Sequence, residues 1–354
     1  MQKRRILFLG ETFRADAITW MNGLKDFGDF EIVTWELQSK STGFSRLKRI
    51  LELAKAIFNL KKTAKNFNAD MVIAERATSY GFLAAISGIK PVAIAQQGIS
   101  DLWPEQSPLY IFKKILQDYA FKKAELLHAW GPIMATHMQK SNVDMAKVMV
   151  LPKGINLKKF EFSNEDNNTI IKAIVTRSLQ AEYHHEVILK AFALLKKQNI
   201  KFELTIVGGG ILLEKLKQLT KTLDLENEVL FTGSIANSEL PKHLQQSNIY
   251  ISMPETEGVS ASLFEAMACG VFPIVTDLPG NRSWINQHQN GILVENKNSI
   301  KLAEAILWTT KNESITRNAI IQNRKFVEEN ANYDINMKKI ADFYHHLINN
   351  KNTI

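Results

Sequence analysis

The feature that most constrains the fold is a regular alternation of short apolar runs with amphipathic segments, which occurs twice along the 354 residues. Apolar runs that are bounded by turn residues and separated by helical segments predict parallel strands joined by helices. In the first half we expect strands at 6–9, 31–35, 69–74, 91–95, 125–130 and 148–152, and in the second half at 170–175, 202–207, 229–232, 248–252, 271–276 and 291–294. The sequence therefore predicts an α/β protein with two doubly wound, Rossmann-like domains.

The boundary between the domains is marked by Pro152-Lys-Gly-Ile-Asn156, and residues 161–168 form a polar stretch without periodicity. A chain of this length exceeds one average domain, so two domains of similar size are expected. We predict an N-terminal domain over 1–160 and a second domain over 161–333. The last helix, 334–354, is expected to pack back toward the N-terminal domain.

The positive charge of the chain is concentrated in its first half. Residues 1–160 contain 24 Lys and Arg against 14 Asp and Glu, whereas residues 161–354 contain 20 against 22. Much of this charge falls in the amphipathic segment 44–62, which can rest on an anionic bilayer surface or can simply be a helix with a solvated basic face. Nucleic acid is not an expected partner, because no recognition module accompanies the charge.

The compartment is indicated by two further features. Cys269 is the single cysteine, so an internal disulfide is excluded, and no apolar run reaches about 18 residues, the length of a membrane-spanning helix. We expect a cytoplasmic protein that can associate peripherally with the inner face of the cell membrane.

The functional residues are expected in the stretch Ser252–Gly270, which reads as a strand, a loop and a helix. Glu257 falls in the loop, Gly258 allows a ligand to approach the backbone, and Ser260 or Ser262 can cap a helix whose free amides attract an anion. Glu265 follows about one turn inside that helix. Other candidates follow predicted strands, where doubly wound sheets bind ligands: Arg177, Gly208–Gly210 and Gly233.

The second half resembles the large retaining glycosyltransferase family of GT-B fold that is often called family 4, or glycosyl transferases group 1. The resemblance rests on Glu257-Gly-Val-Ser-Ala-Ser-Leu-Phe-Glu265 and on Pro273-Ile-Val-Thr-Asp277 with Gly280. Earlier landmarks are Pro152-Lys-Gly-Ile-Asn156 with Phe160, then Arg177, Ile206-Val-Gly208 and Phe231-Thr-Gly233. The resemblance is strongest from Pro152 to Val294, and it implies two Rossmann-like domains that face each other across a cleft.

The resemblance also implies roles for individual residues. Glu257 would bind hydroxyls of the transferred sugar, Glu265 would hold the ribose, and Arg177 would neutralise the departing diphosphate. Glu257 and Arg177 are thus the expected catalytic residues. The remaining donor-side candidates are Gly258, Val259, Ser260 and Ala261 at the sugar and diphosphate, Gly208 and Gly209, Gly233 and Ile235 near the base, and Tyr183 and Arg282. On the acceptor side we expect Gly10, Arg14 and Gly98, and the loops 11–15 and 77–80 would decide which acceptor binds.

Three positions depart from the family pattern. Tyr183 stands where the family often has a lysine that binds phosphate, and Arg282 is a candidate replacement for that missing cation. Where the family usually has a His-Gly pair in the first domain, this chain has Gln97-Gly98. Where the family commonly has a glycine in the glutamate motif, this chain has Ser260.

The resemblance favours transfer of a sugar from a nucleoside-diphosphate sugar, with UDP preferred over GDP, to a glycan or polyprenyl-linked acceptor in surface polysaccharide or glycolipid biosynthesis. No stably bound cofactor or metal is expected, because protein cations can serve the diphosphate. Two alternatives stay open. One is a nucleotide-sugar epimerase of the same fold, and the other is a nucleotide-binding partner subunit with weak activity.

Overall fold

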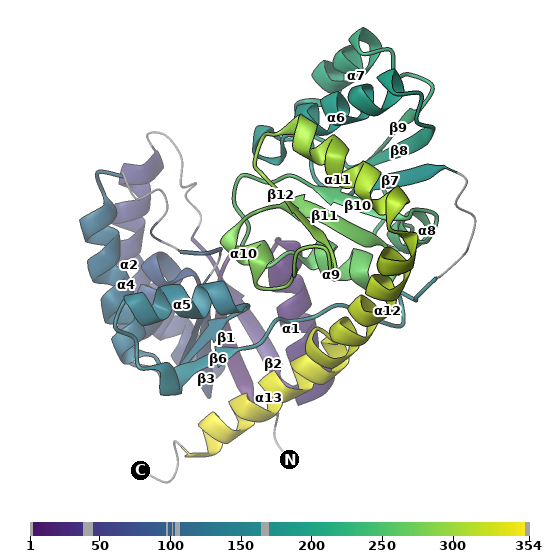
Figure 1. The fold of residues 1–354 in the computed structure, drawn as a ribbon. Helices are drawn as coiled ribbons and strands as arrows, with labels where there is room; N and C mark the ends of the chain where they lie inside the picture. The colour runs from purple at the N-terminus through teal and green to yellow at the C-terminus, as the bar shows by residue number, and fades with distance from the viewer. Residues whose placement is uncertain are drawn as a thin grey trace. The chain divides into compact units, whose positions relative to one another are not determined.

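The structure is a computed structural model, and it describes residues 3–37, 45–96, 98–100, 102, 107–163 and 170–350. Side chains are described within these ranges except at 45–51, 53 and 54. Gln97 and most of the polar stretch 161–168 therefore lie outside the described residues. The chain divides into two compact units, Met1–Lys153 with Tyr333–Ile354 and Gly154–Asn332, each built on a six-stranded parallel sheet (Figure 1).

The sheet of the first unit has the strand order β2-β1-β3-β4-β5-β6. Its strands are β1 (Arg5–Leu9), β2 (Glu31–Trp35), β3 (Met71–Glu75), β4 (Val92–Ala95), β5 (Leu126–Ala129) and β6 (Val148–Val150). Helices connect them: α1 (Ala15–Gly28), α2 (Ser45–Phe67), the π-helix η1 (Arg76–Gly81), α3 (Phe82–Ile86), α4 (Tyr110–Lys123), α5 (Pro132–Lys140) and the 3-10 helix η2 (Met145–Lys147). The central strands β3 and β4 are fully buried and, apart from Glu75 at the end of β3, apolar, as expected of a parallel sheet that is covered on both faces.

The last helix, α13 (Tyr333–Asn350), completes the first unit by packing against α1. The buried ring of His128 in β5 lies 2.7 Å from the Tyr344 hydroxyl, and Asn336 donates a hydrogen bond to the Pro152 carbonyl. Burial lowers the pKa of His128 to about 3, so this contact is made by a neutral imidazole. These buried polar contacts fix the position of α13 in this unit.

The second unit has the strand order β12-β11-β10-β7-β8-β9. Its strands are β7 (Ile171–Val175), β8 (Phe202–Val207), β9 (Val229–Gly233), β10 (Ile249–Ser252), β11 (Phe272–Thr276) and β12 (Ile292–Val294). Its helices are the 3-10 helix η3 (Ala181–Tyr183), α6 (His185–Lys197), α7 (Leu213–Thr222), α8 (Leu240–Gln245), α9 (Ala261–Ala268), α10 (Pro279–Arg282), α11 (Ser299–Lys311) and α12 (Glu313–Asn330).

Alternate residues along these strands feed two separate apolar cores. In β10, Ile249 and Ile251 point into the core that α6 and α11 cover, whereas Tyr250 points into the core that includes α9. This alternation is the geometry of a strand between two helical layers. All twelve predicted strands are confirmed to within two residues at each end.

The first unit ends earlier in the chain than the predicted boundary at residue 160. Ile155 pairs with Asn332, and Phe160 packs into the same core as α9. Residues 154–160 therefore belong physically to the second unit.

Candidate functional site

The second sheet reverses its winding direction between β7 and β10, which are neighbours in the sheet although two strands separate them in the chain. Loops that leave the carboxyl ends of strands diverge at such a switch point, so a crevice for ligands forms there. Arg177 follows β7 by two residues, and Glu257 lies in the loop that follows β10. The fold therefore brings these two residues to one place.

The Arg177 guanidinium is held by three side chains of the β10–α9 segment. Its Nη2 donates to Glu257 Oε2 and to Ser260 Oγ, the latter at 2.6 Å, and its Nε donates to Ser252 Oγ at 3.2 Å. The side chains of Arg177 and Glu257 are only 16% and 12% exposed. Removing one partner would leave a mostly buried charge uncompensated, which is strongly destabilising. The arginine and the glutamate therefore act as one ionic unit.

Ser260 connects this ion pair to the start of α9. Its Oγ accepts a hydrogen bond from the Leu263 amide at 3.2 Å, so Ser260 is the N-cap of α9. The same oxygen accepts from Arg177. The sequence left Ser260 and Ser262 open as caps, and the structure selects Ser260. The serine at this departure from the family pattern thus has a definite structural role.

Glu265 lies one turn inside α9, and its surroundings favour the protonated form. Burial raises the pKa of its carboxyl to about 7, although Lys159 and Arg177 act in the opposite direction. Lys159 lies in a short turn that begins at Asn156, and the Asn156 side chain accepts a hydrogen bond from the Lys159 amide. A half-buried carboxyl whose pKa is shifted toward neutrality in this way is a common feature of functional sites.

Two glycines are required here by close backbone approach. A Cβ on Gly208, whose φ is +141°, would stand 2.6 Å from the Arg177 carbonyl oxygen, and one on Gly280 would stand 2.1 Å from that of Glu257. The Gly208 amide donates to the Gly233 carbonyl at 2.9 Å. The loops after β7, β8 and β9 are thus packed against one another at the carboxyl edge of the sheet.

The other predicted donor residues are placed as follows. Gly258 is buried, Val259 and Ile235 pack against the α9 core, Ala261 is exposed as the first residue of α9, and a Cβ on Gly209 would meet Ser234 Oγ. Their roles toward a ligand stay predictions.

Tyr183, which stands where the family often has a lysine, lies beside the arginine. The Arg177 guanidinium carbon lies 5.4 Å from the centre of the Tyr183 ring, a cation–π contact. His184 and His185 follow at the start of α6, and burial lowers the pKa of His185 to about 4. His185 is therefore uncharged at neutral pH and does not replace the lysine.

Arg282, the candidate replacement cation, lies in α10 and makes a two-pronged ion pair with Asp277, with nitrogen–oxygen distances of 2.6 and 2.9 Å. Its side chain is 59% exposed. Its charge is already partnered, so it would have to leave Asp277 to meet a phosphate.

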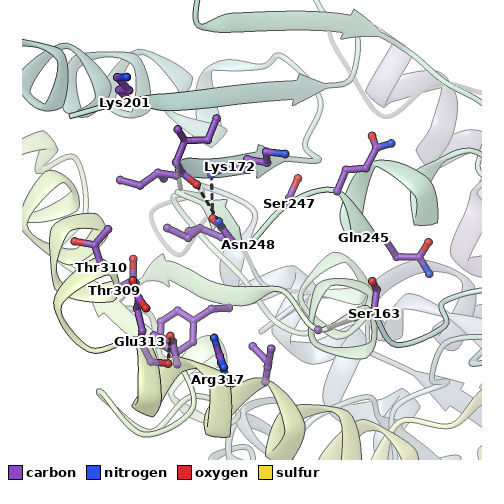
Figure 2. Close-up of a pocket in the computed structure, with 18 of the residues that line it drawn as sticks. Ser163, Lys172, Lys201, Gln245, Ser247, Asn248, Thr309, Thr310, Glu313 and Arg317 are labelled. Carbon is purple, nitrogen blue, oxygen red and sulfur yellow. Dashed lines mark hydrogen bonds between the residues drawn. The ribbon is translucent and has the colours of Figure 1, made fainter. Parts of the chain in front are cut away.

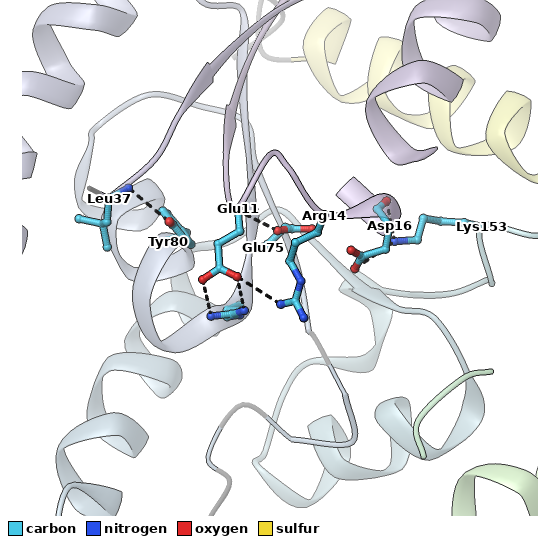
Figure 3. A network of polar contacts seen from close by, with 8 residues as sticks. Glu11, Arg14, Asp16, Leu37, Glu75, Tyr80 and Lys153 are labelled. Atoms are coloured by element: carbon cyan, nitrogen blue, oxygen red, sulfur yellow. Dashed lines mark hydrogen bonds and ion pairs between the residues drawn. The ribbon is translucent and has the colours of Figure 1, made fainter. Parts of the chain in front are cut away.

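The first unit has a polar cluster at its own switch point, between β1 and β3 (Figure 3). Arg76, which directly follows β3, donates to both carboxylate oxygens of Glu11 at 3.1 and 2.8 Å, and Arg14 reaches the same carboxylate at 3.3 Å. Arg76 has a φ of +64° and opens the π-helix η1, and both features are uncommon for an arginine. Strain of this kind is typical of ligand-binding loops.

A buried carboxyl and a buried amine lie beside this cluster. Glu75 is 2% exposed, and it accepts from the Glu11 amide and approaches Gly10 so closely that a Cβ there would stand 2.7 Å from its oxygen. Burial and the charge of Asp16 raise the pKa of Glu75 to about 7. Burial lowers the pKa of Lys153, which lies over the Trp130 ring, whereas Asp16 and Glu75 oppose that shift. Gly98, the other acceptor-side candidate, has a φ of +71°.

Sequence reasoning missed Lys159, Arg76, Glu75 and Lys153. The position of Glu75 and Arg76 at the end of a predicted strand was a usable signal. Nothing in the sequence indicated that Lys159 would face Glu265.

A cavity of about 540 Å³ lies elsewhere in the second unit, at the amino ends of its strands (Figure 2). Lys172, Lys201 and Asn248 line it, and Asn248 accepts a hydrogen bond from the Lys172 amide and donates to the Ile170 carbonyl. This is the edge opposite to Arg177. None of the predicted donor residues lies there.

The described residues contain no group of three or more His, Cys, Asp or Glu side chains that is arranged to hold a metal ion. They also contain no helix that is both long enough and apolar enough to cross a membrane.

Two doubly wound parallel sheets of six strands define the GT-B fold. A crystal structure of HepE from Anabaena in complex with UDP superposes with a TM-score of 0.80 at 16% identity, covering 98% of this chain and all of that one. At this identity the likeness establishes the fold.

Within this fold, residues 156–326 match the family described as glycosyl transferases group 1. The chain is 26% identical over 248 residues to an uncharacterized glycosyltransferase of Methanocaldococcus jannaschii, covering 68% of this chain and 63% of that protein. It is 23% identical over 236 residues to a GDP-mannose-dependent alpha-(1-6)-phosphatidylinositol monomannoside mannosyltransferase of Mycobacterium tuberculosis, covering 63% of this chain and 59% of that protein. The matches thus span about 60% of each relative's own length.

Proposed function

We propose that the chain is a retaining glycosyltransferase of family 4, which transfers a sugar from a nucleoside-diphosphate sugar to a glycan or polyprenyl-linked acceptor. The observation that carries this proposal is the clamp of Arg177, Glu257 and Ser260 at the switch point of the second unit. It combines a fixed cation, a hydroxyl-binding carboxylate and a capped helix start. A departing diphosphate requires such fixed cations and oriented amides.

Arg177, Glu257 and Glu265 each have a role in this reaction. Arg177 neutralises the charge that develops on the leaving diphosphate, and Glu257 accepts hydrogen bonds from hydroxyls of the transferred sugar. Glu265 accepts from the ribose hydroxyls in its ionised form. The acceptor attacks on the face from which the diphosphate leaves, and the leaving phosphate takes the acceptor's proton. No side chain is therefore assigned as a general base, and no stably bound cofactor is proposed.

The substrates are proposed from relatives. UDP is the preferred nucleotide because the HepE structure contains UDP, and the GDP-mannose dependence named for the mycobacterial relative keeps GDP as the alternative. The glycolipid acceptor in that relative's name supports a lipid-linked acceptor, and surface polysaccharide or glycolipid biosynthesis is the proposed process. On the acceptor side we propose Gly10 and Arg14, with Gly98 as a further candidate. We place the protein in the cytoplasm, peripheral to the inner face of the membrane.

A thermal-shift screen over UDP, GDP and their sugars tests the proposal, because a ligand that binds the folded state raises the melting temperature. We expect a UDP compound to raise it in the wild type and in Arg317→Ala, a variant at the opposite edge of the sheet, but not in Arg177→Ala. The active nucleotide sugar is then incubated alone. Release of nucleotide supports transfer, whereas recovery of an epimerised nucleotide sugar would establish the epimerase alternative. Tight binding without any donor hydrolysis would favour the partner-subunit alternative.

A further inference from the structure

Helix α4 turns bulky apolar side chains away from the sheet that it covers. Ile111, Phe112 and Ile115 are 75%, 52% and 61% exposed, whereas Ala120 and Phe121 face the sheet and are buried. A helix on a doubly wound sheet normally presents its apolar stripe to the core and polar groups to water. The spacing of the three exposed residues places them on one face of the helix. Their exposure therefore marks an interaction surface.

Lysines surround this apolar face. Helix α4 contains Lys113, Lys114, Lys122 and Lys123, and its one acidic residue, Asp118, is paired with Lys114 at 2.6 Å. Lys122 and Lys123 are exposed at the end of the helix. The surface is thus apolar at its centre and positively charged at its border.

Helix α2 extends the same surface. Right-handed crossovers place α2, α3 and α4 on one face of the sheet, and α3 packs against both of the longer helices. Ala56, Leu60 and Ala64 of α2 are buried, whereas Phe58 is 78% exposed. The helix contains seven Lys and Arg against one acidic residue, Glu52, and its exposed lysines include Lys55, Lys61, Lys62 and Lys65.

We propose that the outer face of α4, bordered by the basic face of α2, docks on an anionic lipid bilayer, with Ile111, Phe112 and Ile115 entering the boundary between headgroups and acyl chains. A helix that lies in a membrane interface buries its apolar side chains there while lysines contact anionic headgroups. This surface rests on the membrane location given in the proposed function and names the residues that would carry it, and its role does not depend on the transfer reaction itself.

Charge selects the bilayer over a second copy of the chain. The first unit contains 25 Lys and Arg against 16 Asp and Glu. Two copies that met through this face would bring two basic surfaces together, which is unfavourable. An anionic bilayer satisfies both the apolar centre and the basic border.

Co-sedimentation with vesicles tests the inference. The wild-type protein is expected to bind vesicles of phosphatidylcholine with phosphatidylglycerol, and to bind less at high salt because the lysine contacts are screened. The variant Ile111→Asp/Ile115→Asp should lose about 100-fold in partitioning, because two apolar side chains no longer enter the interface. Both positions face water in the free protein, so its melting temperature should equal that of the wild type.

The matched control is Ile300→Asp/Ile321→Asp, which changes two isoleucines of the second unit that are 61% and 52% exposed. This control should bind vesicles like the wild type. Equal loss of binding in both double variants, or undiminished binding of the α4 variant, would refute the inference. Analytical ultracentrifugation provides a second readout: a wild-type dimer that the α4 substitutions dissociate would identify a second copy as the occupant and overturn the bilayer. A nucleotide-dependent thermal shift that persists in the α4 variant keeps this test separate from that of the donor site.

Discussion

Replacing Glu265 with glutamine should change both stability and nucleotide binding in a pH-dependent way. Burial raises the pKa of this carboxyl to about 7, which is about 2.5 above its ordinary value of 4.5. The folded chain therefore holds this proton between pH 4.5 and 7, where the unfolded chain has lost it. The contribution of Glu265 to stability falls as pH rises through this range, and above pH 7 the ionised group costs about 3 kcal/mol at most.

Glutamine has nearly the same shape and cannot ionise, so Glu265→Gln should be the more stable protein at pH 8. An increment of about 2 kcal/mol corresponds to a rise in melting temperature of roughly 5 °C for a unit of this size. At pH 5 the two proteins should melt at nearly the same temperature. The measurement is a set of thermal unfolding scans at pH 5, 6, 7 and 8 without nucleotide.

Under the proposed function, the same substitution should weaken binding of UDP, because ribose hydroxyls donate more strongly to a carboxylate than to a neutral amide. The wild-type affinity should fall by up to about tenfold per pH unit below pH 7, as Glu265 takes up its proton. At pH 8 the glutamine variant should bind about tenfold more weakly or worse.

Isothermal titration of UDP from pH 5.5 to 8.5 measures both effects. UDP itself titrates in this range, and Glu265→Gln supplies the control because its profile contains only the titration of the ligand. Parallel profiles for the two proteins, together with equal melting temperatures at pH 8, would refute the reasoning about Glu265.

Three further predictions follow from single contacts. Ser260→Ala should cost about 1 kcal/mol in urea unfolding through the lost N-cap of α9, and it should weaken UDP binding because Arg177 loses a partner. Gly208→Ala should cost about 2 kcal/mol, because its Cβ would meet the Arg177 carbonyl at a φ of +141°, and no change in the urea midpoint would contradict this. Arg76→Gly should unfold at a higher urea concentration than Arg76→Ala, by about 1 kcal/mol, because both lose the pair with Glu11 but only glycine tolerates a φ of +64°; equal midpoints would show that this backbone is not strained.

The order of the elements could be predicted because each strand here is a buried apolar run between turn residues. Strands such as Phe202–Val207 coincide with their predicted ranges, and helices connect them as the spacing indicated. The predicted GT-B fold is confirmed by the two parallel sheets and by the superposition with HepE. The domain boundary was placed at residue 160 because a polar stretch without periodicity begins at residue 161. Pairing of Ile155 with Asn332 is a long-range contact, which local composition does not encode.

The donor-side candidates could be gathered from sequence because strand ends converge in a doubly wound sheet. That rule brought Arg177 and Glu257 together, and the structure adds that they form an ion pair. The rule did not predict that Lys159 would lie near Glu265, because the position of Lys159 depends on the path of a loop outside the strands. The rule also did not show that Arg282 pairs with Asp277. The sequence around this local pair leaves other roles for Arg282 open.

The two switch points share a chemical arrangement, but only the one in the second unit could be recognised from the sequence. In each unit an arginine after one strand pairs with a glutamate in the loop after the neighbouring strand, as Arg177 does with Glu257 and Arg76 with Glu11. The second-unit pair lies within a long motif, whereas Glu11 and Arg76 are 65 positions apart and belong to no motif in this sequence. The first-unit cluster is therefore identified by its position at the edge of the sheet and not by a sequence motif. Arg76 also has a strained backbone, and it borders the buried carboxyl of Glu75. Both features lower the stability of the first unit at this edge of its sheet, and such costs are common at binding sites.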